Sequence, residues 1–133
     1  MIRPLAASFF LLIFPLLSSG RVPPGPSLGL DYVSALAAAD HFLQAWQSGD
    51  AGSGIALLTE HAKKGLNADD LDKFFSASEP SAYEIDRGKR VKRGRYEFPV
   101  VIVSRISNKL HRKFSSIVIL NTSNNDWAVD KLP

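Results

Sequence analysis

The hydrophobic period of this chain changes at Pro80, and this change constrains the fold more than any other feature. Before Pro80, apolar residues recur at the three- and four-residue spacing of helices. After Pro80, apolar and polar residues alternate as they do in strands. Helices and strands that are segregated along a chain are typical of α+β domains. We therefore expect three N-terminal helices packed on a curved, four-stranded antiparallel sheet.

The clearest helix is predicted over residues 32 to 47 (YVSALAAADHFLQAWQ). At 100° per residue its apolar side chains fall within an arc of about 120°, which predicts one buried face. Asp31 is expected to cap its start, and Ser48-Gly49-Asp50 to end it. The expected buried face consists of Tyr32, Ala35, Leu36, Ala39, Phe42, Leu43 and Trp46.

Two further helices are predicted before Pro80. Asp50 is placed to cap one over residues 51 to 64, and Lys63-Lys64-Gly65 is a favourable end for it. Asn67 is placed to cap the next, with Asp69, Asp70 and Asp72 near its positive end. These acidic residues are therefore explained by helix capping, and we expect no metal site.

Four strands are predicted around Tyr83 and Ile85, and over residues 95 to 106, 111 to 121 and 127 to 132. The turn between the first two is expected at residues 92 to 94, with residues 86 to 88 as an alternative. A further turn is expected at residues 108 and 109. Alternation places four apolar residues on the outer face of the sheet, away from the helices. Because the helices do not bury this face, we expect a homodimer that does. The four residues are Val101, Val103, Ile117 and Ile119.

Residues 1 to 20 have the three-part pattern of a secretory signal peptide. One cation, Arg3, precedes a short apolar stretch that Pro15 interrupts, and small residues end at Gly20, where we expect cleavage. Residues 21 to 30 are rich in proline and glycine and predict a linker. A single domain is expected over residues 31 to 133, secreted or periplasmic after cleavage, or membrane-tethered if the signal is retained.

Overall composition excludes several classes of chemistry. The chain has 133 residues and no cysteine, so disulfides, thiolate catalysis and iron–sulfur clusters are excluded. The formal net charge is only +3, so the bulk charge does not favour nucleic acid as a partner.

Three stretches resemble the nuclear-transport-factor-2-like superfamily, also called cystatin-like α+β cones. AADHFLQAWQSGD at 38 to 50 and IALLT at 55 to 59 resemble its opening helix, Gly-Asp turn and second helix. SSIVILNTSNNDWAVDKLP at 115 to 133 resembles its last two strands. The resemblance implies a pocket between helices and sheet, in a superfamily that includes isomerases, dehydratases, hydrolases, transport proteins and small exported domains. Tyr32, Trp46, Tyr96 and Phe98 are then either pocket-lining residues or core.

No convincing catalytic set is apparent. Asp40 lies at the edge of the apolar face and is the one weak candidate for a general acid or base. His41, His61 and His111 are expected to be solvated; they lack metal-ligand spacing, and we expect no carboxylate to pair with them. We expect no cofactor and lean towards a protein without catalysis.

The segment from residue 87 to 95 concentrates positive charge. It contains Arg87, Lys89, Arg90, Lys92, Arg93 and Arg95 without an acidic residue. One interpretation is a solvated edge that discourages aggregation. Another is attachment to an anionic envelope surface, whereas an exported protein is not expected to meet nucleic acid.

The sequence therefore predicts an exported binding or accessory domain with a pocket for a small apolar ligand. The alternatives are a small-pocket isomerase or hydrolase that uses Asp40, and electrostatic attachment through the basic hairpin.

Overall fold

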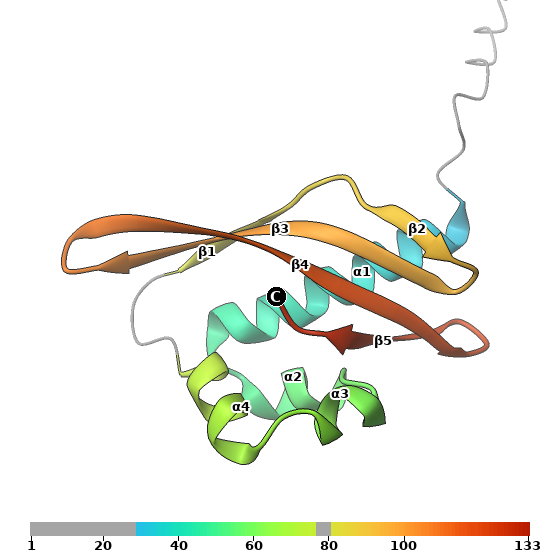
Figure 1. The fold of residues 1–133 in the computed structure, drawn as a ribbon, viewed down its shortest axis with the longest axis horizontal. Helices are drawn as coiled ribbons and strands as arrows, with labels where there is room; N and C mark the ends of the chain where they lie inside the picture. The colour runs from blue at the N-terminus through green and yellow to red at the C-terminus, as the bar shows by residue number, and fades with distance from the viewer. Residues whose placement is uncertain (1–28, 77–80) are drawn as a thin grey trace, which may run out of the picture.

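The computed structural model describes residues 29–76 and 81–133, and this part of the chain forms an α+β domain (Figure 1). The helices precede one antiparallel sheet, as predicted. Within the described residues there are four helices and five strands, rather than three and four. The predicted signal peptide, and the linker as far as residue 28, lie outside the described residues. The elements are α1 (Leu30–Ser48), α2 (Ala51–Ala56), α3 (Glu60–Lys64), α4 (Ala68–Phe75), β1 (Ala82–Ile85), β2 (Lys89–Lys92), β3 (Arg95–Ile106), β4 (Lys109–Ser123) and β5 (Asp126–Lys131).

Helix α1 is the central element of the fold. It packs against β1, β3, β4 and β5 on one side and contacts α2 and α4 on another. In Figure 1 strands β1 to β4 lie above α1 and the short helices lie below it, with β5 next to α3. The strand order is β1-β3-β4-β5, with β2 also paired to β3.

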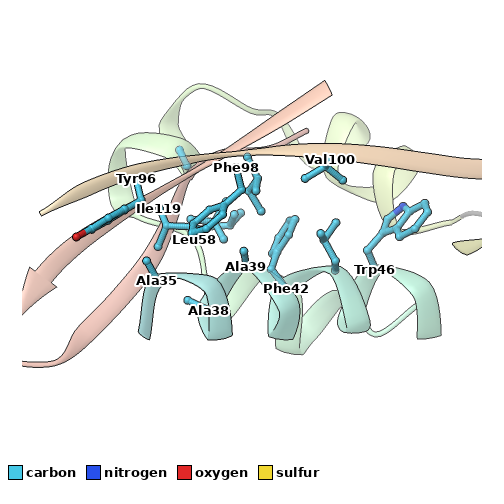
Figure 2. Packing of buried hydrophobic residues seen from close by; sticks show 14 of the residues in the cluster. Ala35, Ala38, Ala39, Phe42, Trp46, Leu58, Tyr96, Phe98, Val100 and Ile119 are labelled. Atoms are coloured by element: carbon cyan, nitrogen blue, oxygen red, sulfur yellow. The ribbon is translucent and has the colours of Figure 1, made fainter. Parts of the chain in front are cut away.

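The core forms where α1 meets the sheet (Figure 2). Ala35, Ala39 and Phe42 are fully buried and point towards the sheet, where Phe98, Val100 and Ile119 lie. The small alanine side chains allow the helix to approach the sheet closely, and the aromatic rings fill the remaining space. The predicted face of α1 is confirmed. Ala38 and Ala45 are buried in addition, because α1 is packed on more than one side.

The predicted end of α1 is also confirmed. Gly49 adopts a φ of 71°, in the left-handed region that glycine occupies without strain. The Gly49 N–H donates to the Trp46 carbonyl at 3.1 Å, which satisfies an end-of-helix acceptor. The expected cap at the start is wrong. Gly29 occupies the cap position, and Asp31 lies in the first turn, where a negative charge favours the helix dipole.

The helix predicted over residues 51 to 64 is instead two helices, α2 and α3. Between them, the Val129 N–H donates to the Leu57 carbonyl at 2.7 Å, and the Thr59 N–H donates to the Val129 carbonyl at 2.9 Å. Without this segment, the edge of β5 would have unpaired backbone groups there. Thr59 then caps α3 by accepting from the Ala62 N–H at 3.0 Å. The two other predicted caps, Asp50 and Asn67, are confirmed.

Strands β1 and β2 lie along the same edge of β3, separated by residues 86 to 88. Opposite this break lies Pro99, whose carbonyl accepts from the Asp86 N–H at 2.9 Å. Proline has no N–H to donate to that edge, so pairing cannot run through it without interruption. The turn between β2 and β3 lies at Arg93–Gly94, the first of the two predicted positions.

The pairing of β3 with β4 corrects the predicted sheet faces. Phe98 is opposite Ile117 and Tyr96 is opposite Ile119, so both isoleucines face the core and are fully buried. The expectation that Ile117 and Ile119 lie on the outer face is therefore wrong. Alternate residues of a strand face opposite sides, so Phe114 belongs to the outer face with Val101.

The hairpin between β3 and β4 turns at Ser107 and Asn108, which have φ values of 50° and 63°. This is one residue earlier than predicted, and positive φ at both positions matches a two-residue hairpin turn. In Figure 1 the end of this hairpin extends past the helices. At the opposite end of the sheet, the Asn121 N–H donates to the Gly94 carbonyl at 2.8 Å. The basic stretches at residues 87 to 95 and 109 to 113 therefore lie at opposite ends of the sheet. None of the helices in the described ranges is long and apolar enough to cross a membrane.

Candidate functional site

The four residues predicted to line a pocket are part of the packed interior. The ring centroids of Tyr32 and Phe98 are 5.3 Å apart, and those of Tyr32 and Tyr96 are 5.9 Å apart. The Tyr32 hydroxyl accepts from the Gly88 N–H at 3.0 Å. Trp46 lies further along α1 and contacts Phe74 instead, with centroids 6.2 Å apart. The structure thus brings three of the four together, and their contact with a ligand stays a prediction.

Asp40, the candidate for acid–base chemistry, is held by two neighbours. Its Oδ1 accepts from the Tyr83 hydroxyl at 2.6 Å, and its Oδ2 accepts from the Gln44 Nε2 at 2.8 Å. Burial of Tyr83, together with the hydrogen bond and negative charge of Asp40, raises the pKa of Tyr83 to about 12. Both groups border an open depression of about 410 Å³. Both carboxylate oxygens of Asp40 are therefore already engaged.

A larger cavity, of about 550 Å³, lies between α3, α4 and the end of β5. Its apolar lining includes Leu66, Phe74 and Leu132. Its charged lining comprises Lys64, Asp70, Asp130 and Lys131, and the imidazole of His61 also borders it. None of the residues predicted to line a pocket borders it. The sequence could not reveal this cavity, because its walls come from segments about 60 residues apart that meet only after folding.

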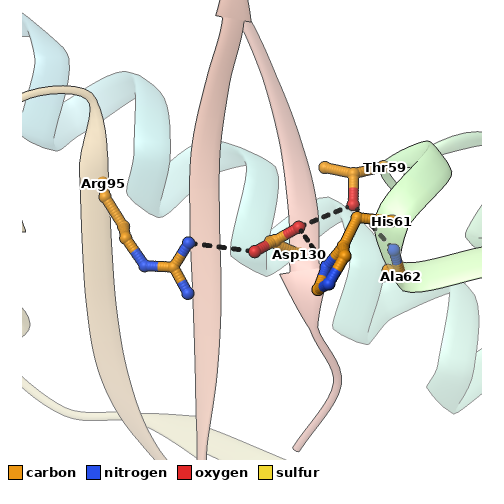
Figure 3. Close-up of polar contacts among 5 residues, drawn as sticks. All are labelled: Thr59, His61, Ala62, Arg95 and Asp130. Carbon is orange, nitrogen blue, oxygen red and sulfur yellow. Dashed lines mark hydrogen bonds and ion pairs between the residues drawn. The ribbon is translucent and has the colours of Figure 1, made fainter. Parts of the chain in front are cut away.

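Asp130 is the centre of a polar network on the wall of this cavity (Figure 3). Its Oδ1 accepts from the Thr59 hydroxyl at 2.8 Å and lies 3.3 Å from the His61 Nδ1. Its Oδ2 pairs with Nη1 of Arg95 at 3.0 Å. Only 7% of the Asp130 side chain is exposed, whereas the His61 side chain is 86% exposed. The network therefore joins β3, β5 and α3 through one buried carboxylate.

Asp130 remains ionised although it is buried. Burial alone would raise its pKa, but the hydrogen bonds from Thr59 and Arg95, the charge of Arg95 and the contact with His61 together lower the pKa below its ordinary value. An ionised carboxylate can only accept, so the proton on His61 lies on Nδ1, between the two residues. In the neutral imidazole, Nε2 then has a free lone pair.

The expectation that no carboxylate pairs with a histidine is wrong for His61. The two residues are 69 positions apart, and the sequence around each is typical of ordinary secondary structure. Alternation along β5 could have indicated that Asp130 faces away from the buried Val129. The partners of Asp130 on α3 and β3 could not have been found in this way.

The basic cluster is divided by the fold. Arg87, Lys89, Arg90, Lys92 and Arg93 are exposed, and three of these are on β2. Arg95 is half-buried and pairs with Asp130, so it is not part of a free cationic surface. The attachment of the exposed members to an anionic surface stays a prediction.

Within residues 29–76 and 81–133, no group of three or more His, Cys, Asp or Glu side chains is arranged to hold a metal ion. Asp70 instead completes the capping box of α4. Its carboxylate accepts from the Asn67 N–H, and its backbone N–H donates to Oδ1 of Asn67 at 2.8 Å.

Comparison with family models and with curated proteins finds no match for this chain. The arguments below therefore rest on the site alone.

Proposed function

We propose that this chain is an exported, non-catalytic binding domain. Its ligand is a small molecule with an apolar body and one negatively charged group. The observation that carries this proposal is the cavity of about 550 Å³ between α3, α4 and β5. Ligand sites are typically concave and mostly apolar, with volumes of roughly 300–1,000 Å³ and a few polar groups that orient the ligand.

The apolar body is favoured by Leu66, Phe74 and Leu132, which line the cavity. Phe74 is partly buried and stacks on Phe42, with ring centroids 5.7 Å apart. A wall that is anchored to the core in this way keeps its shape when empty. A preformed wall lowers the entropic cost of binding.

The negative group is favoured by the balance of charge at the cavity. The charge of Asp130 is compensated by Arg95, and Asp70 is engaged in capping α4. Among the described residues, neither Lys64 nor Lys131 takes part in an ion pair. The two lysines are therefore available to an anionic ligand group.

The broader family assignment is part of the same proposal. We assign the chain to the nuclear-transport-factor-2-like cones, with α1 held in the concave side of a curved sheet. The order of helices before an antiparallel sheet supports this assignment. Export is supported by the signal-like pattern of residues 1 to 20.

The test uses anilinonaphthalene sulfonate, a fluorescent probe with an apolar body and one anionic group. The wild-type chain should bind it saturably with one site. A Lys64→Glu/Lys131→Glu variant should bind at least about tenfold more weakly, a loss of about 1.4 kcal/mol. The control is Lys73→Glu, an exposed change on α4 outside the cavity lining.

Circular dichroism and unfolding curves must show that every variant is folded, because the probe also binds loosened proteins. Native mass spectrometry of the secreted protein then reports any retained ligand. Equal probe affinity for wild type and the double variant would reject the cavity as the binding site.

The 3.3 Å contact between His61 and Asp130 favours a second candidate, acid–base catalysis by His61. The carboxylate orients the imidazole as catalytic pairs do. Hydrolysis of p-nitrophenyl acetate should then fall at least about tenfold in His61→Gln. The matched control is His41→Gln, an exposed change on α1. Equal rates for wild type and His61→Gln would eliminate this candidate.

A further inference from the structure

The far end of the β3–β4 hairpin gathers exposed apolar side chains. Phe114 is 76% exposed, Leu110 is 66% exposed and Ile106 is 56% exposed. Such large apolar groups in contact with water are unfavourable unless a partner covers them. In Figure 1 this end of the hairpin lies beyond the helices, so they do not cover it.

The strand register shows which of these side chains share a face. Leu110 is opposite Arg105, Arg112 is opposite Val103, and Phe114 is opposite Val101. Directly opposed residues lie on the same side of a sheet, and residues two apart along a strand do as well. These six side chains therefore form one surface on the face away from α1, which we call the outer hairpin patch.

The surroundings of this patch are strongly cationic. Between Pro99 and Asn125 the chain has no acidic residue. Of the cations in this stretch, Arg105 and Arg112 belong to the patch, whereas Lys109, His111 and Lys113 lie on the opposite face of β4. The acid that the register brings nearest is Glu84 of β1, which lies opposite Val101 at the base of the patch. The partner that complements this surface is therefore anionic.

A second copy of the chain is a poorer occupant. Arg112 lies between Leu110 and Phe114 on the same face of β4. A two-fold contact through the patch would bury Arg105 and Arg112 beside the same cations of the other copy. Such burial of charges without opposite partners is costly.

We propose that the outer hairpin patch binds the surface of a phospholipid bilayer that contains anionic headgroups. Leu110 and Phe114 enter the boundary between headgroups and acyl chains. The guanidinium groups of Arg105 and Arg112 reach the phosphates while their stems remain against the apolar residues. This site is separate from the cavity of the proposed function, and either can fail without the other.

Vesicle flotation tests the proposal, with phosphatidylcholine alone and with added phosphatidylglycerol. The full chain is used throughout, so residues 1 to 20 contribute equally to every variant. Partitioning onto anionic vesicles should fall at least about tenfold in Leu110→Ser/Phe114→Ser and in Arg105→Gln/Arg112→Gln. Binding of the wild type should also weaken with salt.

The matched controls change the other basic end of the sheet. They are Val91→Ser, a half-exposed apolar residue of β2, and Lys92→Gln/Arg93→Gln. Each should alter partitioning by less than about twofold, because these residues lie outside the patch. Controls that weaken binding as much as the patch variants would overturn the proposal and favour non-specific attraction or attachment through β2.

A local fluorescence probe tests directly whether position 114 enters the bilayer. In Phe114→Trp, the added fluorescence should shift to the blue and be quenched by brominated lipid, whereas in Val91→Trp it should not. An unshifted signal from Phe114→Trp would overturn the proposal. It would also be overturned if light scattering showed a wild-type dimer that Leu110→Ser/Phe114→Ser converts to a monomer.

Discussion

Arg95 of β3 and Asp130 of β5 form an ion pair at 3.0 Å across the intervening strand β4 (Figure 3). The other carboxylate oxygen of Asp130 accepts from Thr59, next to α3. One buried carboxylate therefore connects β3 and β5 to the segment that bounds the cavity.

Replacing Asp130 by asparagine should destabilise the fold. The neutral amide has only one accepting oxygen, and it leaves Arg95 half-buried without its counter-ion. We expect Asp130→Asn to lower the free energy of unfolding by about 2 kcal/mol at neutral pH. Urea unfolding followed by tryptophan fluorescence measures this. Glu84→Gln, an exposed change on β1, is the control and should alter stability by less than about 0.5 kcal/mol.

The same pair predicts a pH dependence of definite sign. The pKa of Asp130 is lowered in the folded protein, so the folded state binds its proton less readily than the unfolded chain does. The stabilisation is therefore complete above the unfolded pKa of about 3.9 and is lost as the pH falls through the folded pKa. The stability difference between wild type and Asp130→Asn should shrink in acid. A difference that stays constant down to the lowest accessible pH would contradict this.

The Thr59 hydroxyl takes part in two hydrogen bonds that stabilise the fold. Its hydroxyl accepts from the Ala62 N–H at 3.0 Å and donates to Asp130 at 2.8 Å. Thr59→Val keeps the shape but removes both bonds, and should cost about 1–3 kcal/mol. Thr59→Ser keeps the hydroxyl and should retain most of the stability. If thermal unfolding midpoints were the same for both variants, the hydroxyl would have no such role.

Two glycines of α2 should respond in opposite directions to alanine. A Cβ at Gly54 would overlap the ring of Phe75, which is itself buried, so Gly54→Ala should cost about 1–3 kcal/mol. At Gly52 the nearest atom to an added Cβ is Oδ1 of Asp50, at 3.7 Å. Gly52→Ala should therefore stabilise the helix by about 0.5–1 kcal/mol. Chemical denaturation of both variants tests this, and equal shifts would show that the Phe75 contact is unimportant.

Tyr83 should ionise at unusually high pH. Its pKa is raised to about 12, first by burial and then by the hydrogen bond and charge of Asp40. A raised pKa means that the stabilisation is complete below the ordinary value of 10.0 and is lost as the pH rises through about 12. Asp40→Asn should lower the pKa of Tyr83. The ultraviolet difference titration between each protein and its Tyr83→Phe counterpart isolates this group, and an unchanged pKa would contradict the assignment.

Local features of this fold were predictable from the sequence, and the candidate cavity was not. The buried face of α1, its end at Gly49 and the cap at Asn67 depend on residues within a few positions of one another. The split between α2 and α3 depends instead on Val129, which forms hydrogen bonds with Leu57 and Thr59 from far along the chain. The break between β1 and β2 lies opposite Pro99, which has no N–H to donate to the edge strand. The alternation of apolar and polar residues alone did not reveal this break.

The sequence by itself determined the α+β class and the order of elements, because hydrophobic period and capping act over single turns and strands. Tertiary structure decided the register of β3 with β4, and hence that Ile117 faces the core while Phe114 faces outwards. It also decided that His61 meets Asp130. The physical reason is that shifting the pairing of a strand by one residue does not change its alternating sequence, but moves every side chain to the opposite face of the sheet. Only packing against α1 selects between the two arrangements.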